Sequence, residues 1–349
     1  MIRKYLITGG LGFIGSNLSR YLSKNESNEI LIVDSLTYSG NLNSLPEMSS
    51  QKNISFSRTS LSERDELSKI IANYRPDVIM HLAAESHVDK SIDSPRIFID
   101  TNIIGTFNLL ESARDYLKIN NDFLFMHIST DEVFGDLDNK QSKFDENSNY
   151  DPSSPYSASK ASSDHLVRAW GRTYGINFII SNCSNNYGPF QFPEKLIPHM
   201  ILSALSNKDL PIYGDGSQIR DWLHVEDHCK ALEIISLKGK IGRTYLIGGD
   251  NEITNKDIVL NICEILQNLL PTSSKKTDHY KQLIKFVKDR PGHDRKYAID
   301  FKLISKELGW KPQVEFHEGL SRTVKWYLDN KGWWEEILDK KYKLERIGK

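Results

Sequence analysis

The sequence predicts an α/β fold built on a doubly wound parallel sheet, and three observations carry this prediction. Short apolar runs of strand length alternate with longer amphipathic stretches through the first half of the chain. A glycine-rich turn follows the first apolar run. Polar segments follow several later runs, and ligands bind beyond the carboxyl ends of the strands in such sheets. These polar segments are therefore expected to share one rim.

The strands are expected where apolar runs are short, and the helices where apolar residues recur with helical periodicity. The expected strands are residues 4–8, 30–34, 54–57, 78–82, 123–128, 178–182 and 243–247. The expected helices include one that follows Gly15, and residues 65–74, 96–118, 156–174, 225–237 and 255–269.

After Gly188 the alternation breaks, and several prolines punctuate loops and short helices. We therefore expect two domains. Residues 1–188 plus about 221–248 are predicted to form a dinucleotide-binding domain. Residues from about 189–220 plus 249–349 are predicted to form a smaller, discontinuous α/β domain that binds the substrate, whose C-terminal helices could pack back on the first domain.

Composition excludes several classes of function. The 349 residues carry a net charge of −1, which gives no reason to expect nucleic acid as a partner. No apolar run reaches the roughly 18 residues of a membrane span, and the sequence enters its first strand without a signal-peptide pattern. The three widely spaced cysteines, Cys183, Cys229 and Cys263, suit a reducing compartment. A cytoplasmic protein without a membrane partner is expected.

The glycine-rich turn, Thr8–Gly15, has the spacing of a Rossmann-type dinucleotide fingerprint. Its glycines, Gly9, Gly12 and Gly15, would allow the tight turn and the close approach of backbone to a pyrophosphate. Asp34 ends the next strand, where an acid binds the ribose 2′-hydroxyl. Because no arginine directly follows Asp34, the sequence favours NAD over NADP.

Tyr156 and Lys160 are spaced to lie on one face of a helix that Pro155 can start. A nearby cation favours a phenolate, so we expect Lys160 to lower the pKa of Tyr156. Tyr156 would then take the proton of an alcohol while hydride leaves its carbon. Upstream, Asp131 and Glu132 stand side by side and add an acid and a base. That pair predicts the elimination of water beside the new ketone.

Other charged and metal-binding residue types allow weaker interpretations. Lys195, Arg220 and Arg290 are candidate clamps for a substrate diphosphate, or ordinary ion-pair residues. His224 and His228 have a spacing that could hold a metal, but a strand end followed by the first turn of a helix is the simpler explanation. No metal is expected.

With these residues in view, the chain resembles an extended short-chain dehydrogenase/reductase, and most closely the dTDP-glucose 4,6-dehydratases. The motifs that carry the resemblance run from residue 8 to about residue 300. They include T-G-G-L-G-F-I-G, H-L-A-A-E-S-H-V-D, S-T-D-E-V-F-G, S-P-Y-S-A-S-K, N-C-S-N-N-Y-G-P, P-E-K-L-I-P and D-R-P-G-H-D. The acidic pair and R-P-G-H-D are the most specific.

The resemblance implies a role for each matching residue. Tyr156, supported by Lys160, would be the base on the sugar 4-hydroxyl, to which Thr130 would hydrogen-bond. Glu132 would take the proton from carbon 5, and Asp131 would protonate the departing 6-hydroxyl. Hydride would leave carbon 4 and return to carbon 6, so tightly bound NAD would be recycled in each turnover.

The resemblance also implies two sets of binding positions. The cofactor set is Gly9, Gly12, Phe13, Ile14, Gly15, Asp34, Ser35, Leu36, Thr37, Ser60, Leu61, Leu82, Ala83, Ala84, Ser86, Thr101, Tyr156, Lys160 and Asn186. The set that would face a nucleotide sugar is Ser86, Thr130, Asn185, Lys195, Leu196, Pro211, Ile212, Tyr213, Arg220, Asn251, Asp289, Arg290, Pro291, Gly292 and His293.

A homodimer built from residues 96–118 and 156–174 is also implied. Two positions depart from the family pattern: Phe134 replaces the usual tyrosine after D-E-V, and Ser60 replaces an acid that contacts adenine.

Three alternatives stay open. A UDP-glucose 4,6-dehydratase differs only by the thymine methyl, a nucleotide-sugar 4-epimerase would not need Asp131 and Glu132, and a non-catalytic dinucleotide sensor would not need Tyr156 and Lys160.

Overall fold

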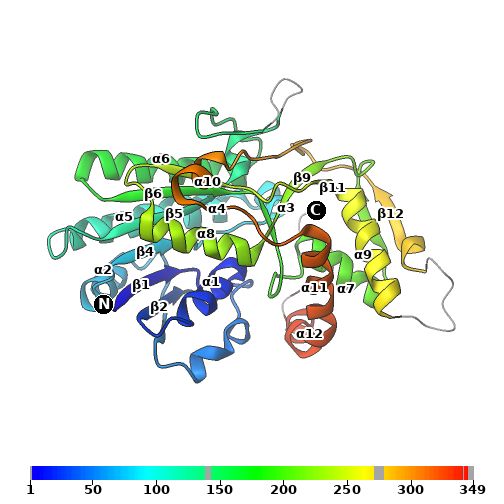
Figure 1. Ribbon diagram of the computed structural model, residues 1–349, viewed down its shortest axis with the longest axis horizontal. Coiled ribbons are helices and arrows are strands. Elements are labelled where there is room, and N and C mark those ends of the chain that lie inside the picture. The colour runs from blue at the N-terminus through cyan, green and yellow to red at the C-terminus, as the bar shows by residue number, and fades with distance from the viewer. Residues whose placement is uncertain (1, 138–142, 271–278, 341, 345–349) are drawn as a thin grey trace.

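The computed structural model describes residues 2–137, 143–270, 279–340 and 342–344. Its main element is a seven-stranded parallel sheet with the strand order β10-β6-β5-β4-β1-β2-β3 (Figure 1). The strands are β1 (Arg3–Thr8), β2 (Asn28–Asp34), β3 (Ile54–Arg58), β4 (Val78–His81), β5 (Leu124–Thr130), β6 (Phe178–Cys183) and β10 (Thr244–Ile247). The predicted doubly wound sheet is confirmed.

Helices cover both faces of this sheet, which is why its strands read as nearly continuous apolar runs. Along β1, Tyr5 and Ile7 face one helical layer, whereas Leu6 faces the other. The first layer is α1 (Phe13–Ser23), α8 (Val225–Lys238) and α10 (Lys302–Leu308), and the second is α2 (Arg64–Tyr74), α5 (Gly105–Tyr116) and α6 (Pro155–Tyr174).

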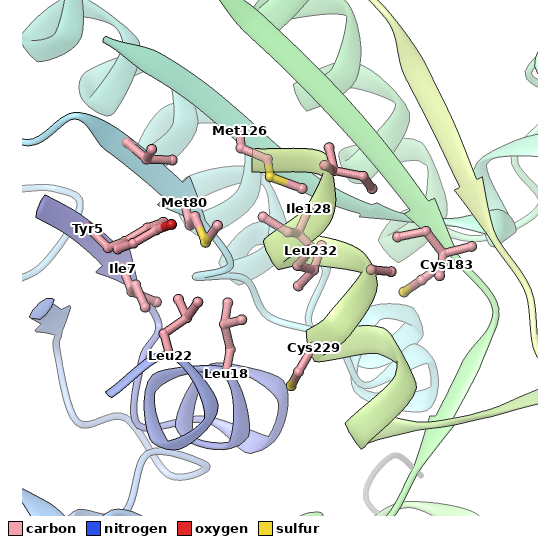
Figure 2. Packing of buried hydrophobic residues seen from close by; sticks show 14 of the residues in the cluster. Tyr5, Ile7, Leu18, Leu22, Met80, Met126, Ile128, Cys183, Cys229 and Leu232 are labelled. Atoms are coloured by element: carbon pink, nitrogen blue, oxygen red, sulfur yellow. The ribbon is translucent and has the colours of Figure 1, made fainter. Parts of the chain in front are cut away.

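Figure 2 shows the packing of the first layer. Leu18 and Leu22 of α1 lie beneath the strand residues Tyr5 and Ile7, and Leu232 of α8 lies beside them. All of these side chains are buried. Burial of one such side chain stabilises the fold by about 1.5–3 kcal/mol, so this layer holds the glycine turn rigidly against the sheet.

The predicted helix at residues 96–118 is interrupted in the structure. It consists of α4 (Pro95–Phe98), a π-helical stretch η3 (Ile99–Ile104) and α5. Such π-helical turns are rare and frequently lie at functional sites. Here Thr101 of η3 lines the cofactor cavity described below, and Asn102 accepts a hydrogen bond from the backbone of Glu85.

A second group of elements lies beside the carboxyl ends of the main sheet (Figure 1). It contains two small sheets, with the orders β11-β9-β7 and β12-β8. The strands are β7 (Asn185–Tyr187), β8 (Leu210–Tyr213), β9 (Ile219–His224), β11 (Glu252–Thr254) and β12 (Ile284–Val287). The helices are α7 (Leu196–Leu205), α9 (Asn255–Leu269), α11 (Phe316–Asp329) and α12 (Lys331–Lys340).

These elements share a hydrophobic cluster separate from those of the main sheet. By contrast, α10 contributes Ile304 and Leu308 to the cluster around α1 and α8. The packing therefore places α10 against the first helical layer. The division into two domains, with its boundaries, stays a prediction. In the described part of the chain, no helix is long and apolar enough to cross a membrane.

Candidate active site

The glycine turn is built so closely that side chains do not fit at two of its positions. Gly9 has a φ of +69°, and a Cβ there would lie 2.7 Å from the backbone of Ala83. A Cβ on Gly15 would overlap the carbonyl of Gly9. Gly12 is the N-cap residue of α1, and no side chain caps this helix. The first N–H groups of the helix therefore stay available to a phosphate.

Asp34, at the end of β2, is held by two backbone N–H groups. Its Oδ2 accepts from Leu11 at 3.0 Å, and its Oδ1 accepts from Leu36 at 2.8 Å. These bonds fix the carboxylate beside the glycine turn. The predicted cofactor residues thus form a cradle of backbone donors and one oriented acid, which fits a dinucleotide.

A cavity of ≈490 Å³ lies over this cradle. Every predicted cofactor residue except Leu36 lines it: Gly9, Gly12, Phe13, Ile14, Gly15, Asp34, Ser35, Thr37, Ser60, Leu61, Leu82, Ala83, Ala84, Ser86, Thr101, Tyr156, Lys160 and Asn186. Leu36, at a φ of +55°, packs instead against the core of the first helical layer.

The predicted catalytic residues lie at the wall of the same cavity. Thr130, Asp131 and Glu132 lie where β5 meets the short helix η4 (Asp131–Phe134), and Tyr156 and Lys160 lie on α6. Thr130 caps η4, because its Oγ1 accepts from the Glu132 N–H at 3.3 Å. The same hydroxyl donates to Asp131 Oδ1 at 3.3 Å. Phe134 is buried, and its ring stacks on Phe144 with 5.2 Å between centroids.

The two neighbouring carboxyls have different environments. Burial and the charge of Glu132 raise the pKa of Asp131 well above its ordinary value. Burial also raises the pKa of Glu132, but Arg290, Arg220 and Lys195 oppose the rise. Nearby cations thus oppose protonation of Glu132, whereas the charge of Glu132 adds to the effect of burial on Asp131. Two neighbouring carboxyls in such unlike environments suit the acid and the base that an elimination needs.

We expected Lys160 to lower the pKa of Tyr156, and this is not found. Burial, followed by the charge of Glu132, raises the pKa of Tyr156 well above its ordinary value, and a hydrogen-bonding interaction with Thr130 opposes this rise. The Lys160 ammonium donates to the carbonyl of Ile128 at 2.9 Å, and burial lowers its own pKa. The sequence placed the two side chains on one helix face but could not account for their burial.

A buried polar network behind Lys160 was not anticipated. Asp164 lies on α6, one turn after Lys160, and its Oδ1 is 3.2 Å from His127 Nε2. Its Oδ2 accepts from the Tyr150 hydroxyl at 2.7 Å. Burial raises the pKa of Asp164, but its partners, His127 first, outweigh burial and lower it overall. The fully buried Asp164 carboxylate thus offsets the charge of Lys160.

A second cavity of ≈700 Å³ adjoins the first. Of the predicted substrate residues, Ser86, Asn185, Lys195, Leu196, Pro211, Ile212, Tyr213, Arg220, Arg290 and His293 line it. Both cavities share Glu132, Ser86, Asn185, Glu194 and Lys195. Thr130 lines only the first cavity. Glu132 therefore stands where a group bound in one cavity meets a group bound in the other.

The three predicted cations are each held by a partner. Lys195 donates to the carbonyl of Ser86 at 2.6 Å, and Arg290 pairs with Asp89 at 2.7 Å. Arg220 donates to the carbonyl of Asp294 at 2.8 Å and lies over the ring of Tyr297.

Sequence reasoning missed Asp89, Tyr297 and Glu194, all of which line the second cavity. The available signals were the positions of Asp89 within H-L-A-A-E-S-H-V-D and of Glu194 within P-E-K-L-I-P. Tyr297 joins them at the cavity from a segment distant in the sequence.

Four predicted substrate residues, Asn251, Asp289, Pro291 and Gly292, do not line either cavity. Asn251 donates to the carbonyl of Gly249 at 2.6 Å. Asp289 Oδ1 lies 2.6 Å from His293 Nδ1, so Asp289 orients a residue that does line the cavity.

His224 and His228 take structural positions. His224 caps α8 by accepting from the Glu226 N–H, and His228 Nδ1 lies 2.9 Å from Asn186 Oδ1. Among the residues that the structure describes, no group of three or more potential ligands is placed to hold a metal.

Known proteins match the chain along nearly its whole length. The sequence profile of GDP-mannose 4,6 dehydratase matches residues 6–323. A dTDP-glucose 4,6-dehydratase from Neisseria meningitidis is 55% identical over 99% of both chains. The chain belongs to the dTDP-glucose 4,6-dehydratase family.

Two solved structures are similar to this member of the dTDP-glucose 4,6-dehydratase family. DesIV, a dTDP-glucose 4,6-dehydratase from Streptomyces venezuelae with NAD and TYD bound, is 40% identical, with a TM-score of 0.88 over 96% of this chain and 99% of that chain. A UDP-glucose 4-epimerase from Thermotoga maritima is 28% identical, with a TM-score of 0.83 over 94% of this chain and 99% of that chain. Dehydratases of this family and epimerases thus share the fold.

Proposed function

We propose that the chain converts dTDP-glucose to dTDP-4-keto-6-deoxyglucose. The reaction comprises oxidation at carbon 4, loss of water across carbons 5 and 6, and return of hydride to carbon 6. The observation that carries this proposal is the acidic pair Asp131 and Glu132, held in unlike environments beside Tyr156. A 4-epimerase shares the fold and needs the tyrosine, but it has no use for such a pair.

Each step falls to a residue at the wall of the first cavity. Tyr156 takes the proton of the 4-hydroxyl, and Thr130 holds that hydroxyl. The ketone makes the proton on carbon 5 acidic, so the ionised Glu132 removes it. Asp131, kept protonated by burial, donates to the departing 6-hydroxyl. Lys160 lies one turn after Tyr156 on α6 and orients the reacting groups. Asp164 balances its charge.

The cofactor that fits the first cavity is NAD. Its pyrophosphate would rest against the glycine turn and the N-terminus of α1, and Asp34 would accept from the ribose hydroxyls. When bound, NAD accepts the hydride from carbon 4 and returns it to carbon 6, so it is recycled within each turnover. Ser60, at the adenine end, offers a hydroxyl that here lies 2.9 Å from Ser62 Oγ.

The second cavity would hold the nucleoside diphosphate. Arg220, Arg290 and Lys195 line it and suit a diphosphate, whereas Pro211, Ile212 and Tyr213 offer apolar and aromatic surface to a base. A single methyl group distinguishes thymine from uracil and is worth about 1–3 kcal/mol of discrimination. The chain should therefore prefer one nucleotide over the other only by this free-energy difference. The proposed nucleotide of the substrate is dTDP.

A cytoplasmic homodimer completes the proposal. Ile97, Ile99 and Ile104 are exposed on the segment that precedes α5, and they give this face an apolar surface. Pairing residues 96–118 and 156–174 of two subunits would cover it. Sedimentation of the purified protein should give twice the mass of one chain. Ile97→Glu combined with Ile104→Glu should shift the protein toward the monomer.

Labelled substrate tests the reaction. dTDP-glucose with deuterium at carbon 4 should give a product lighter by one water that carries the deuterium on carbon 6 of the same molecule. Carbon 5 should acquire hydrogen from the solvent. Mixing labelled and unlabelled substrate reveals any crossover, and deuterium scrambled between products would overturn the proposal. Parallel reactions with UDP-glucose and CDP-glucose would measure the nucleotide preference.

A further inference from the structure

Asp89 lies where the two groups of elements meet. It belongs to α3 (Val88–Asp93), a short helix that comes after β4 in the chain and contacts α6 beside the main sheet. The residue is 5% exposed and lines the second cavity. Asp89 takes no part in the proposed reaction, so its contacts indicate a different role.

Both oxygens of the Asp89 carboxylate accept hydrogen bonds from residues of the second group. Oδ1 accepts from Arg290 Nη1 at 2.7 Å, and Oδ2 accepts from the Tyr213 hydroxyl at 2.8 Å. Tyr213 is the last residue of β8, and Arg290 follows β12, which pairs with β8 in parallel. One carboxylate from the side of the main sheet therefore ties together the carboxyl ends of two neighbouring strands.

The carboxylate is suited to hold two donors. Burial raises the pKa of Asp89, but Arg290 and Tyr213 outweigh burial and lower it overall. The group therefore stays ionised near neutral pH, and an ionised carboxylate only accepts hydrogen bonds. Neither an amide nor an alcohol at this position could accept from both partners in the same geometry.

Arg290 keeps donors that Asp89 does not use. A guanidinium carries several N–H donors in one plane and no acceptor. Asp89 takes a donor at Nη1, whereas Nε is buried and has no hydrogen-bond partner in the described part of the chain. A buried donor without a partner costs free energy, and a diphosphate oxygen is a partner of the right charge. The bond to Asp89 thus fixes the plane of the guanidinium and leaves Nε for the substrate.

Tyr213 is held at its hydroxyl and at its ring. The hydroxyl donates to Asp89, and the ring meets that of His293 edge-on, with 6.1 Å between centroids. A tyrosine side chain has few rotatable bonds, so these two contacts fix its orientation. The ring thereby offers an oriented aromatic surface to a base.

We propose that Asp89 is a positioning residue for the nucleoside diphosphate. By bonding Arg290 and Tyr213 through the two oxygens of one carboxylate, it sets the distance between the cation that binds the diphosphate and the ring that lies beside the base. This inference rests on the proposed function, and it gives Asp89 no contact with the reacting carbons. Removal of Asp89 should therefore weaken nucleotide binding far more than it slows the chemistry.

A double-mutant cycle on the affinity for dTDP tests whether Asp89 acts through Tyr213. Asp89→Ala removes both bonds and should weaken dTDP binding about tenfold, the scale of one lost hydrogen bond to a charged group. Tyr213→Phe keeps the ring and loses the hydroxyl, and it should weaken binding about threefold. The double variant should bind dTDP no more weakly than Asp89→Ala, because the partner of the hydroxyl is already absent. Isothermal titration calorimetry measures each affinity.

Kinetics and control variants separate positioning from a general loss of structure. Asp89→Ala should raise KM for dTDP-glucose about tenfold, with kcat within about threefold of the unaltered protein. Its NAD content should be unchanged, because Asp89 lies outside the cofactor cavity. Asp89→Asn keeps the shape of the side chain and an oxygen for Arg290, so its affinity for dTDP should be intermediate even if the alanine variant fails to fold. Asp93→Ala, exposed on the same helix, should leave that affinity unchanged.

The contrary outcomes are specific. Losses that multiply in the double variant, to about thirtyfold, would mean that the Tyr213 hydroxyl acts independently of Asp89, and the inference would be wrong. Unchanged dTDP affinity in both Asp89 variants, or a lower kcat at unchanged KM, would also overturn it. The cycle measures binding without turnover. Failure of the unaltered protein to dehydrate dTDP-glucose would therefore refute the proposed reaction, whereas an additive cycle would refute only the role of Asp89.

Discussion

Asp131 and Glu132 are adjacent residues of similar chemistry for which we propose opposite tasks. Both are buried in the protein, which raises the pKa of each carboxyl. Arg290 and Arg220 oppose this rise in the pKa of Glu132, whereas the charges of Glu132 and Asp221 add to it in Asp131. The sequence identified the pair. The division of roles depends on cations from segments more than eighty residues away, which the sequence did not place.

Replacing Tyr156 with Phe should block the first oxidation, because the ring remains and the hydroxyl that takes the 4-hydroxyl proton is lost. Turnover should fall by about 10²–10⁴-fold, with NAD still bound. Product mass and the NAD content of the purified protein measure both effects. Tyr21→Phe is a matched control, since Tyr21 bonds to Glu233 away from the site. Near-normal turnover in Tyr156→Phe would move the base to another residue.

Replacing Glu132 with Gln should spare oxidation and impair elimination, because only the later step needs a carboxylate at carbon 5. The variant should accumulate a 4-keto sugar that retains its 6-hydroxyl, which mass spectrometry detects two mass units below the substrate. Glu264→Gln, on the surface helix α9, controls for the loss of one charge. Equal losses of oxidation and elimination would contradict the separate roles.

At the scale of elements, the main sheet was predictable because each strand is a short apolar run between polar segments. The strands of the small sheets were harder to predict. β7 is only Asn185–Tyr187, and β11 is only Glu252–Thr254, so neither has an apolar run or a clear alternation. Their pairing with β9 depends on the tertiary fold. The π-helical η3 likewise has no sequence signal, and the segment reads as one continuous helix.

The N-terminus of α6 is the element on which the catalytic geometry depends. Ser154 and Ser157 form a capping box, in which each side chain accepts from the other residue's N–H. Ser154→Ala should lower the free energy of unfolding by about 0.5–2 kcal/mol. Urea denaturation measures this cost. Ser162→Ala, within the same helix, should cost nothing, because alanine favours a helix interior. Equal stabilities of the two variants would contradict the capping argument.

At the scale of the molecule, the site lies where two groups of elements meet. On the cofactor side, the glycine turn, Asp34, Tyr156 and Lys160 could be predicted from local pattern, and they line one cavity. On the substrate side, residue type suggested Lys195, Arg220 and Arg290, and the family resemblance supplied the other positions. The wall on that side combines residues from α7, β8, β9 and the segment after β12 with the far C-terminal residues Tyr342 and Leu344. No local pattern brings such distant segments together.

The C-terminal segment therefore offers a test of the whole arrangement. Tyr342 lines the second cavity, and its hydroxyl lies 3.0 Å from His199 Nδ1. Its ring lies near that of Phe192, which lines the first cavity. Tyr342 is not among the residues proposed to react, so we expect it to contribute equally to the binding of substrate and transition state. Tyr342→Ala should then raise KM for dTDP-glucose several-fold, with kcat nearly unchanged, because uniform binding is lost. Tyr342→Phe, which keeps the ring, should have a smaller effect. Steady-state kinetics and the affinity for dTDP measure both. A lower kcat at unchanged KM would mean that the C-terminal segment acts on the chemistry and not on binding.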